Sequence, residues 1–143
     1  MSRQVSVFSE NKPGKINRIT TILEDKNINI KAITISDSGD YGIIKLLLDR
    51  PEEGCAALKD SGIAATLKDI VAVRVPDRPG GLRKVAAILA DNNINVEDAY
   101  GFTLKDGDEG VFVFQVDNVP GAEKILRETG CAILDESELY LRS

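Results

Sequence analysis

The sequence predicts an α+β fold built from two similar modules, each with the element order βαββαβ. Three observations lead to this prediction. A Pro-Gly turn occurs twice, each time between an alternating apolar stretch and a stretch with helical periodicity. The residues that follow each turn repeat at a constant spacing. Each copy also contains two strand-like stretches separated by a short polar turn.

An internal repeat divides the chain into two halves. A Pro-Gly pair and an Asn-Ile-Asn motif both return after 66 residues, and two later motifs return after 68 residues. The matched segments are 13–14 with 79–80, 27–30 with 93–96, 42–44 with 110–112, and 48–49 with 116–117. Matches on both sides of one two-residue length change indicate a duplicated module. We therefore place the modules at residues 1–69 and 70–143.

The first module begins with a strand over residues 4–9, where Val5 and Val7 alternate with polar residues. Isoleucine and leucine then recur at helical spacing, which predicts an amphipathic helix over residues 13–26 that stops at Asn27. A β-branched run, a polar turn and a second apolar run predict a hairpin, followed by another helix and a short strand. These elements are predicted at 28–36 and 41–48 for the hairpin strands, 51–61 for the helix and 63–67 for the last strand.

The second module repeats this order. Its strands are predicted at 71–75, 95–104, 111–116 and 131–134, its helices at 79–91 and 119–129, and its hairpin turn at 106–108. Residues 139–141 remain and are predicted as an edge strand. Right-handed crossovers make each module ferredoxin-like, with both helices on one face of an antiparallel sheet. The apolar runs at 43–48 and 111–116 also need cover on the other face, which two modules related by a pseudo-two-fold axis can give each other.

Composition excludes several classes of protein. Hydrophobic residues make up 43% and charged residues 29% of the chain, which is typical of a globular protein. The apolar runs are far shorter than the ~20 residues of a membrane span, and no export signal is evident. Histidine is absent, and the two cysteines have no metal-ligand spacing, so we expect no catalytic residue, metal or cofactor. The net charge of −5 argues against a nucleic-acid partner.

Each Pro-Gly turn has the chemistry of an amino-acid site. The first N–H groups of the following helix lack partners within the helix and favour a carboxylate. Gly14 and Gly80 allow a ligand to approach the backbone. Asn11 and Asp77 stand at the mouths of the turns, where a side-chain oxygen can accept a hydrogen bond from an ammonium group. The alternative interpretation is that these two residues merely cap the helices.

A second repeated element is the Asn-Ile-Asn motif. Its first asparagine is explained as a helix stop at Asn27 and Asn93. The second asparagine, Asn29 or Asn95, is not needed for that stop. It either faces solvent or a turn, or it contacts the neighbouring module.

These motifs resemble the ACT domain family, small regulatory modules that bind amino acids and are attached to enzymes of amino-acid metabolism. The resemblance rests on SENKPGKI at residues 9–16 and VPDRPGGL at residues 75–82, each followed by the Asn-Ile-Asn motif. It covers nearly the whole chain, twice. The chain is similar to stand-alone tandem ACT proteins, which have no catalytic domain.

The resemblance implies ligand sites between modules, each formed by the turn of one module and the second strand of its neighbour. The implied residues are Asn11, Lys12, Pro13, Gly14, Lys15 and Ile16 with Asn95 and Val96 opposite, and Asp77, Arg78, Pro79, Gly80, Gly81 and Leu82 with Asn29 and Ile30 opposite. The copies differ where Asp77 replaces Asn11 and Gly81 replaces Lys15. We therefore expect the two sites to differ in affinity, or only one to be occupied.

The resemblance implies a non-catalytic, cytoplasmic regulatory protein that binds a free amino acid, forms a homodimer and acts on an enzyme of amino-acid metabolism. The alternative is an interaction or scaffold subunit of such an enzyme complex without a ligand of its own. An RNA-binding module with the same element order would need stacking aromatic residues in a basic motif, and the sequence has none. Tyr100, Phe102, Phe112 and Phe114 instead suit a core or an interface, or the apolar wall of a ligand pocket.

Overall fold

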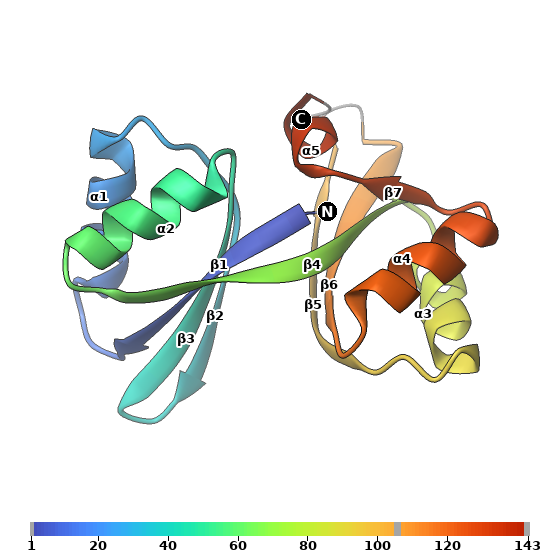
Figure 1. The fold of residues 1–143 in the computed structure, drawn as a ribbon, viewed down its shortest axis with the longest axis horizontal. Helices are drawn as coiled ribbons and strands as arrows, with labels where there is room; N and C mark the ends of the chain where they lie inside the picture. Colours follow the sequence, from blue (N-terminus) through green and yellow to red (C-terminus); the bar gives the residue numbers. More distant parts are fainter. Residues whose placement is uncertain (1, 105–106, 142–143) are drawn as a thin grey trace. The chain divides into compact units, whose positions relative to one another are not determined.

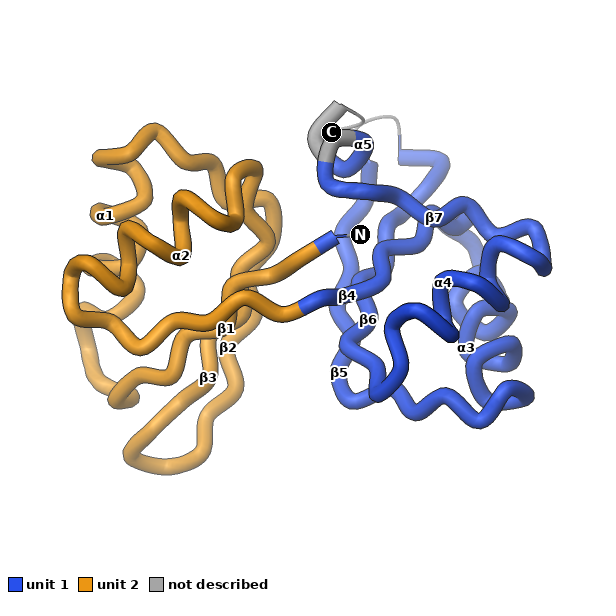
Figure 2. The backbone as a smooth tube through the Cα atoms, viewed as in Figure 1, with its two compact units in different colours: residues 1–2, 69–143 blue, residues 3–68 orange. Residues whose placement is uncertain are grey.

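The computed structural model describes residues 2–104 and 107–141. The chain separates into two compact units, one of residues 3–68 and one of residues 69–143 together with 1–2 (Figure 2). Each unit has its own helices and its own hydrophobic core.

The first unit is an antiparallel sheet covered on one face by two helices (Figure 1). Its elements are β1 (Ser2–Glu10) from residue 3 onward, α1 (Lys15–Asp25), β2 (Ile30–Ser38), β3 (Tyr41–Leu48), α2 (Pro51–Asp60) and the first part of β4 (Ala64–Pro76). Neighbouring strands follow the order β2-β3-β1-β4. Val7 and Ile44 pair across β1 and β3, so their side chains share a face, and they pack against Ile19 and Leu23 of α1 and Leu58 of α2.

The second unit repeats this architecture. It contains the second part of β4, then α3 (Gly81–Asp91), β5 (Val96–Thr103), β6 (Glu109–Val116), α4 (Val119–Glu128), β7 (Ala132–Leu134) and the short helix α5 (Glu136–Leu141). Neighbouring strands follow the order β7-β4-β6-β5. The core joins Val73 of β4 and Phe114 of β6 to Leu89 of α3 and Leu126 of α4. Burial of each such side chain stabilises the fold by about 1.5–3 kcal/mol.

This architecture confirms the predicted α+β class of two ferredoxin-like βαββαβ modules with antiparallel sheets. The predicted helix stops are also confirmed, because Asn27 and Asn93 both adopt a left-handed backbone with φ of 56°. Of the four aromatic residues for which a core, an interface or a pocket wall was predicted, Phe114 is buried and Phe112 packs against the same core. The ring centroids of Phe112 and Phe114 are 6.5 Å apart.

The two short strands predicted at 63–67 and 71–75 are in fact one continuous strand, β4. No glycine or proline interrupts residues 64–75, and the β-branched pair Ile70-Val71 favours an extended backbone through the join. The polar pair Lys68-Asp69, between the two predicted strands, lies within β4.

The edge strand predicted at residues 139–141 is wrong, since these residues belong to helix α5. Asp135 starts the helix because its Oδ1 accepts a hydrogen bond from the Glu138 N–H at 3.0 Å. Two acidic residues in the first turn also favour a helix start.

The predicted starts of two helices need correction, and one residue of a predicted turn lies outside the described residues. Helices α1 and α3 begin two residues later than predicted, because the glycine after each proline has a left-handed backbone. Of the predicted turn at 106–108, Asp106 lies outside the described residues.

Candidate functional site

Two equivalent loops connect the first strand of each unit to its first helix. The glycine before the helix has φ of 92° at Gly14 and 90° at Gly80. Within the described residues, neither helix start has a side-chain capping hydrogen bond. By contrast, α4 is capped by Asn118, whose side-chain oxygen accepts from the Gly121 N–H at 3.0 Å. The first-turn N–H groups of α1 and α3 can therefore donate hydrogen bonds to a carboxylate or another anion.

Asn11 is held by the turn between β2 and β3 and not by the helix start. Its N–H donates to the Asp40 carbonyl at 2.8 Å. Its Nδ2 donates to Asp37 Oδ1 at 2.8 Å and to the Gly39 carbonyl at 3.4 Å. No residue in the described part of the chain donates to Asn11 Oδ1. The capping interpretation is therefore wrong for Asn11, and its oxygen is a fixed acceptor at the mouth of the loop.

Asp77 occupies the same place in the second loop. Its N–H donates to the Asp108 carbonyl at 3.0 Å, as the Asn11 N–H does to Asp40. Its carboxylate forms no hydrogen bond or ion pair with the residues that the structure describes, and it does not cap α3. A carboxylate without a protein partner is an available counter-ion for an ammonium group.

Gly81 has a steric reason to differ from Lys15, its counterpart in the first loop. A Cβ atom at Gly81 would overlap the backbone oxygen of Pro76. In the second loop the start of α3 therefore lies too close to the end of β4 for any residue with a side chain at position 81.

A hollow of about 310 Å³ opens beside the second loop at the start of α3. The described residues that line it include three basic side chains, Arg74, Arg78 and Lys84, and no carboxylate. The Nε of Arg74 also lies 3.2 Å from Glu109 Oε2. Arg78 and Lys84 beside a helix N-terminus therefore favour an anionic group of a ligand. The sequence had indicated Arg78 but not Arg74 or Lys84.

In the first unit, two exposed aromatic residues stand at the positions that correspond to Arg74 and Glu109. Phe8 and Tyr41 stack there with ring centroids 5.2 Å apart, and 56% of Phe8 and 48% of Tyr41 is exposed. These two positions correspond in the repeat to Arg74 and Glu109, which form an ion pair in the second unit. The surfaces around the two loops are thus chemically unlike.

The residues before the second strand of each unit are fixed by an aspartate. The Asn29 N–H donates to Asp49 Oδ1 at 3.1 Å, and the Asp49 N–H donates back to the Asn29 carbonyl at 3.2 Å. Asn95 and Asp117 exchange the same two bonds at 3.0 and 3.2 Å. Sequence reasoning did not include these aspartates in the site, although their repetition at a spacing of 68 residues was a usable signal.

A β-bulge follows in both of these strands. The pairing register shifts between Ile30 and Ala32 in β2, and between Val96 and Asp98 in β5. Both strands lie at an edge of the sheet in their unit. Bulges redirect side chains and are frequent beside functional sites, and an edge strand leaves backbone groups open to another module.

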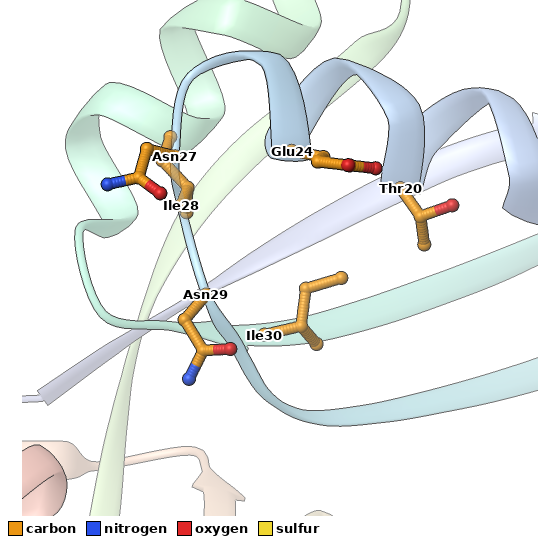
Figure 3. Close-up of a pocket in the computed structure, with 6 residues that line it drawn as sticks. All are labelled: Thr20, Glu24, Asn27, Ile28, Asn29 and Ile30. Carbon is orange, nitrogen blue, oxygen red and sulfur yellow. The ribbon is translucent and has the colours of Figure 1, made fainter.

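Asn29 and Ile30 also line a hollow of about 320 Å³ in the first unit. Figure 3 shows Thr20 and Glu24 projecting from α1 above these two residues. The carboxylate of Glu24 forms no hydrogen bond or ion pair with any described residue. Sequence reasoning missed Thr20 and Glu24, because only the fold brings this side of α1 next to the start of β2.

The predicted site residues are divided evenly between the units. The first unit contains the loop at 11–16 together with Asn29 and Ile30, and the second contains the loop at 77–82 together with Asn95 and Val96. Each predicted site combines residues from different units, so this pairing stays a prediction.

Other chemistry is sparse in the described residues. They contain no group of three or more acidic, cysteine or histidine side chains that could hold a metal ion. Cys55 is buried and Cys131 is half-buried, and neither forms a disulfide. No helix in the described part of the chain is both long enough and apolar enough to span a membrane.

Two ferredoxin-like modules with matching Pro-Gly loops define a class of tandem-module proteins. The family model for the ACT domain pair matches residues 1–141, so the chain belongs to this family, as the sequence motifs predicted. No curated protein matches the chain.

Solved structures share this fold. A Bacteroides thetaiotaomicron protein matches with a TM-score of 0.91 and 31% identity, over 97% of this chain and 95% of that chain. The ligand-free regulatory subunit of aspartate kinase from Thermus thermophilus matches with a TM-score of 0.66 and 16% identity, over 90% and 92%. The corresponding subunit from Thermus flavus matches with a TM-score of 0.60 and 18% identity, over 87% and 88%. The two aspartate kinase subunits show a common fold only.

Proposed function

We propose that this chain is a non-catalytic regulatory protein that binds a small free amino acid between ACT modules. The observation that carries this proposal is the duplicated loop, in which an uncapped helix start lies beside a side-chain oxygen without a donor from the described residues, at Asn11 and at Asp77. An α-amino acid offers the matching pair of groups. Its carboxylate accepts from the helix N–H groups, and its ammonium donates to the side-chain oxygen.

The opposite wall of each site comes from the strand start of another module. Asn95 and Val96 face the loop at 11–16 in this proposal, while Asn29 and Ile30 face the loop at 77–82. Two features support it: each strand start lies at a sheet edge beside a bulge, and Val96 and Leu82 remain 39% and 41% exposed. Exposed apolar side chains at the edge of a site favour cover by a partner surface.

Binding acts by a population shift in this proposal. A ligand that touches two modules stabilises the arrangement in which both halves of the site meet. A homodimer or an enzyme of amino-acid metabolism then responds to that arrangement, in the cytoplasm where free amino acids are available. The family match to ACT domain pairs supports a regulatory role, and the aspartate kinase subunits of the same fold are themselves described as regulatory.

A second candidate function is that of an interaction subunit without its own ligand. The exposed Phe8–Tyr41 stack, next to Ile43 at 39% exposure, favours this alternative because exposed apolar patches often bind proteins. The two candidates differ in whether a free amino acid binds the isolated protein.

The decisive experiment is a series of thermal melts with each of the twenty amino acids at millimolar concentration. A ligand at a hundred times its Kd adds about 2.7 kcal/mol to the unfolding free energy, which raises the Tm measurably. Asn11→Ala and Asp77→Ala then report the site, with the exposed residues Asn17→Ala and Asp91→Ala as matched controls. If no amino acid raises the Tm of the wild-type protein, the ligand-binding function is wrong.

A further inference from the structure

We propose that the hollow between α1 and the start of β2 receives an ammonium group of the ligand, and that Glu24 is the counter-ion of that group. This inference rests on the proposed function, because Asn29 and Ile30 of the same hollow belong to the proposed amino-acid site. It adds a ligand-contacting residue from a helix face that the repeated motifs do not include.

The hollow has the size of a small-molecule site. Its volume of about 320 Å³ lies at the lower end of the range of ligand pockets, about 300–1,000 Å³. Ile28 and Ile30 supply apolar surface, and Thr20 and Glu24 supply oxygens from α1 (Figure 3). The Thr20 hydroxyl donates to the Ile16 carbonyl at 2.9 Å, so its oxygen can still accept a hydrogen bond from an ammonium group.

Among the described residues, Glu24 is the only charged one that lines this hollow. On α1 the positions one helical turn before Glu24 hold Thr20 and Thr21, and the helix ends at Asp25, so no basic residue stands one turn away on this helix. Within the described residues its carboxylate has neither an ion pair nor a hydrogen bond. The protein therefore leaves one uncompensated negative charge at the rim of an otherwise neutral hollow, which favours a cationic group.

The second module lacks this feature. The repeat places Ala86 and Ala90 at the positions of Thr20 and Glu24, while Asn95 and Val96 still match Asn29 and Ile30. The two copies thus keep the strand start but differ in the helix side of the site. We infer that only the wall formed by the first module discriminates a ligand by its ammonium group.

The test uses the amino acid that gives the largest thermal shift with the wild-type protein. Calorimetric titration compares the wild type with Glu24→Gln and with Asp25→Asn, which changes an adjacent exposed carboxylate that does not line the hollow. Glu24→Gln weakens binding by about fivefold to tenfold, because a charge-assisted hydrogen bond is lost at a partly solvated site. Asp25→Asn leaves the affinity within about twofold, as expected for a surface charge that makes no contact.

Two analogues of the amino acid show which of its ammonium groups contacts Glu24. One carries a hydroxyl in place of the α-ammonium, and the other, for a basic ligand, lacks the side-chain ammonium. The analogue without the group that contacts Glu24 binds the wild type and Glu24→Gln equally.

Three results overturn the inference. Equal affinity of the wild type and Glu24→Gln for the amino acid rejects it while the proposed function stands. An equal loss in Asp25→Asn shows a general charge effect and also rejects it. If no amino acid binds the wild type, both the inference and the proposed function fail.

Discussion

Single residues make the two loops unequal. Asn11 is fixed by the turn that contains Asp37 and Gly39, whereas the Asp77 carboxylate has no partner among the described residues. The repeated motif predicted where these residues stand. It did not predict their contacts, because Asp37 and Gly39 come from a turn that only the folded sheet brings to the loop.

Gly80 and Gly81 of the second loop are glycines for different physical reasons: the first for its backbone conformation, the second for lack of space. Gly80 has φ of 90° and open space around it, so Gly80→Ala costs only the strain of a left-handed backbone, about 1–2 kcal/mol. In Gly81→Ala the new Cβ meets the Pro76 oxygen, and we expect a larger loss of about 2–4 kcal/mol. Urea unfolding of both variants checks this order. A smaller loss for Gly81→Ala than for Gly80→Ala would contradict the described loop.

Tyr100 predicts a pH dependence of stability. Burial, together with the neighbouring Asp98 carboxylate, raises the pKa of the Tyr100 phenol in the folded protein. A raised folded-state pKa contributes stability that is complete below the unfolded value of about 10 and is lost as the pH rises above it. The unfolding free energy therefore falls by up to about 1.4 kcal/mol per pH unit in this window from Tyr100 alone. Tyr100→Phe has a flatter profile from about pH 9 to 11, and parallel profiles would refute this origin.

At the scale of elements, the repeat predicted most of the fold. Pro-Gly turns and the Asn stops at 27 and 93 delimit both first helices. The join within β4 was not predicted, because Lys68-Asp69 is polar and an exposed strand position tolerates the same residues as a loop. The sequence also did not predict that Thr20 and Glu24 line the hollow. Helical periodicity shows which side of a helix is polar, but it does not show which strand lies beside that side.

Helix starts provide a test at this scale. Only α4 uses a side-chain cap among the four long helices, and Asn118→Ala removes the bond to the Gly121 N–H. We expect a loss of about 1 kcal/mol in unfolding free energy, measured by urea denaturation. Asn17→Ala, on the exposed side of α1, is the control and changes stability by less than about 0.5 kcal/mol. Equal losses in both variants would argue against the cap.

For the whole molecule, the central claim is that each ligand site combines a loop of one unit with a strand start of the other. The side chains of Asn29 and Asn95 are suitable probes, because the bonds to Asp49 and Asp117 use the asparagine backbone and survive substitution by alanine. Their loss therefore affects a ligand contact more than the fold.

Calorimetric site counting in paired variants tests this claim most directly. In our account Asn11→Ala and Asn95→Ala damage the same site, so the double variant loses no more sites than either single variant. Asn11→Ala combined with Asn29→Ala damages both sites and abolishes binding of the amino acid. The opposite grouping would contradict the account: Asn11→Ala with Asn29→Ala would lose no more sites than either single variant, while Asn11→Ala with Asn95→Ala would lose more sites than either.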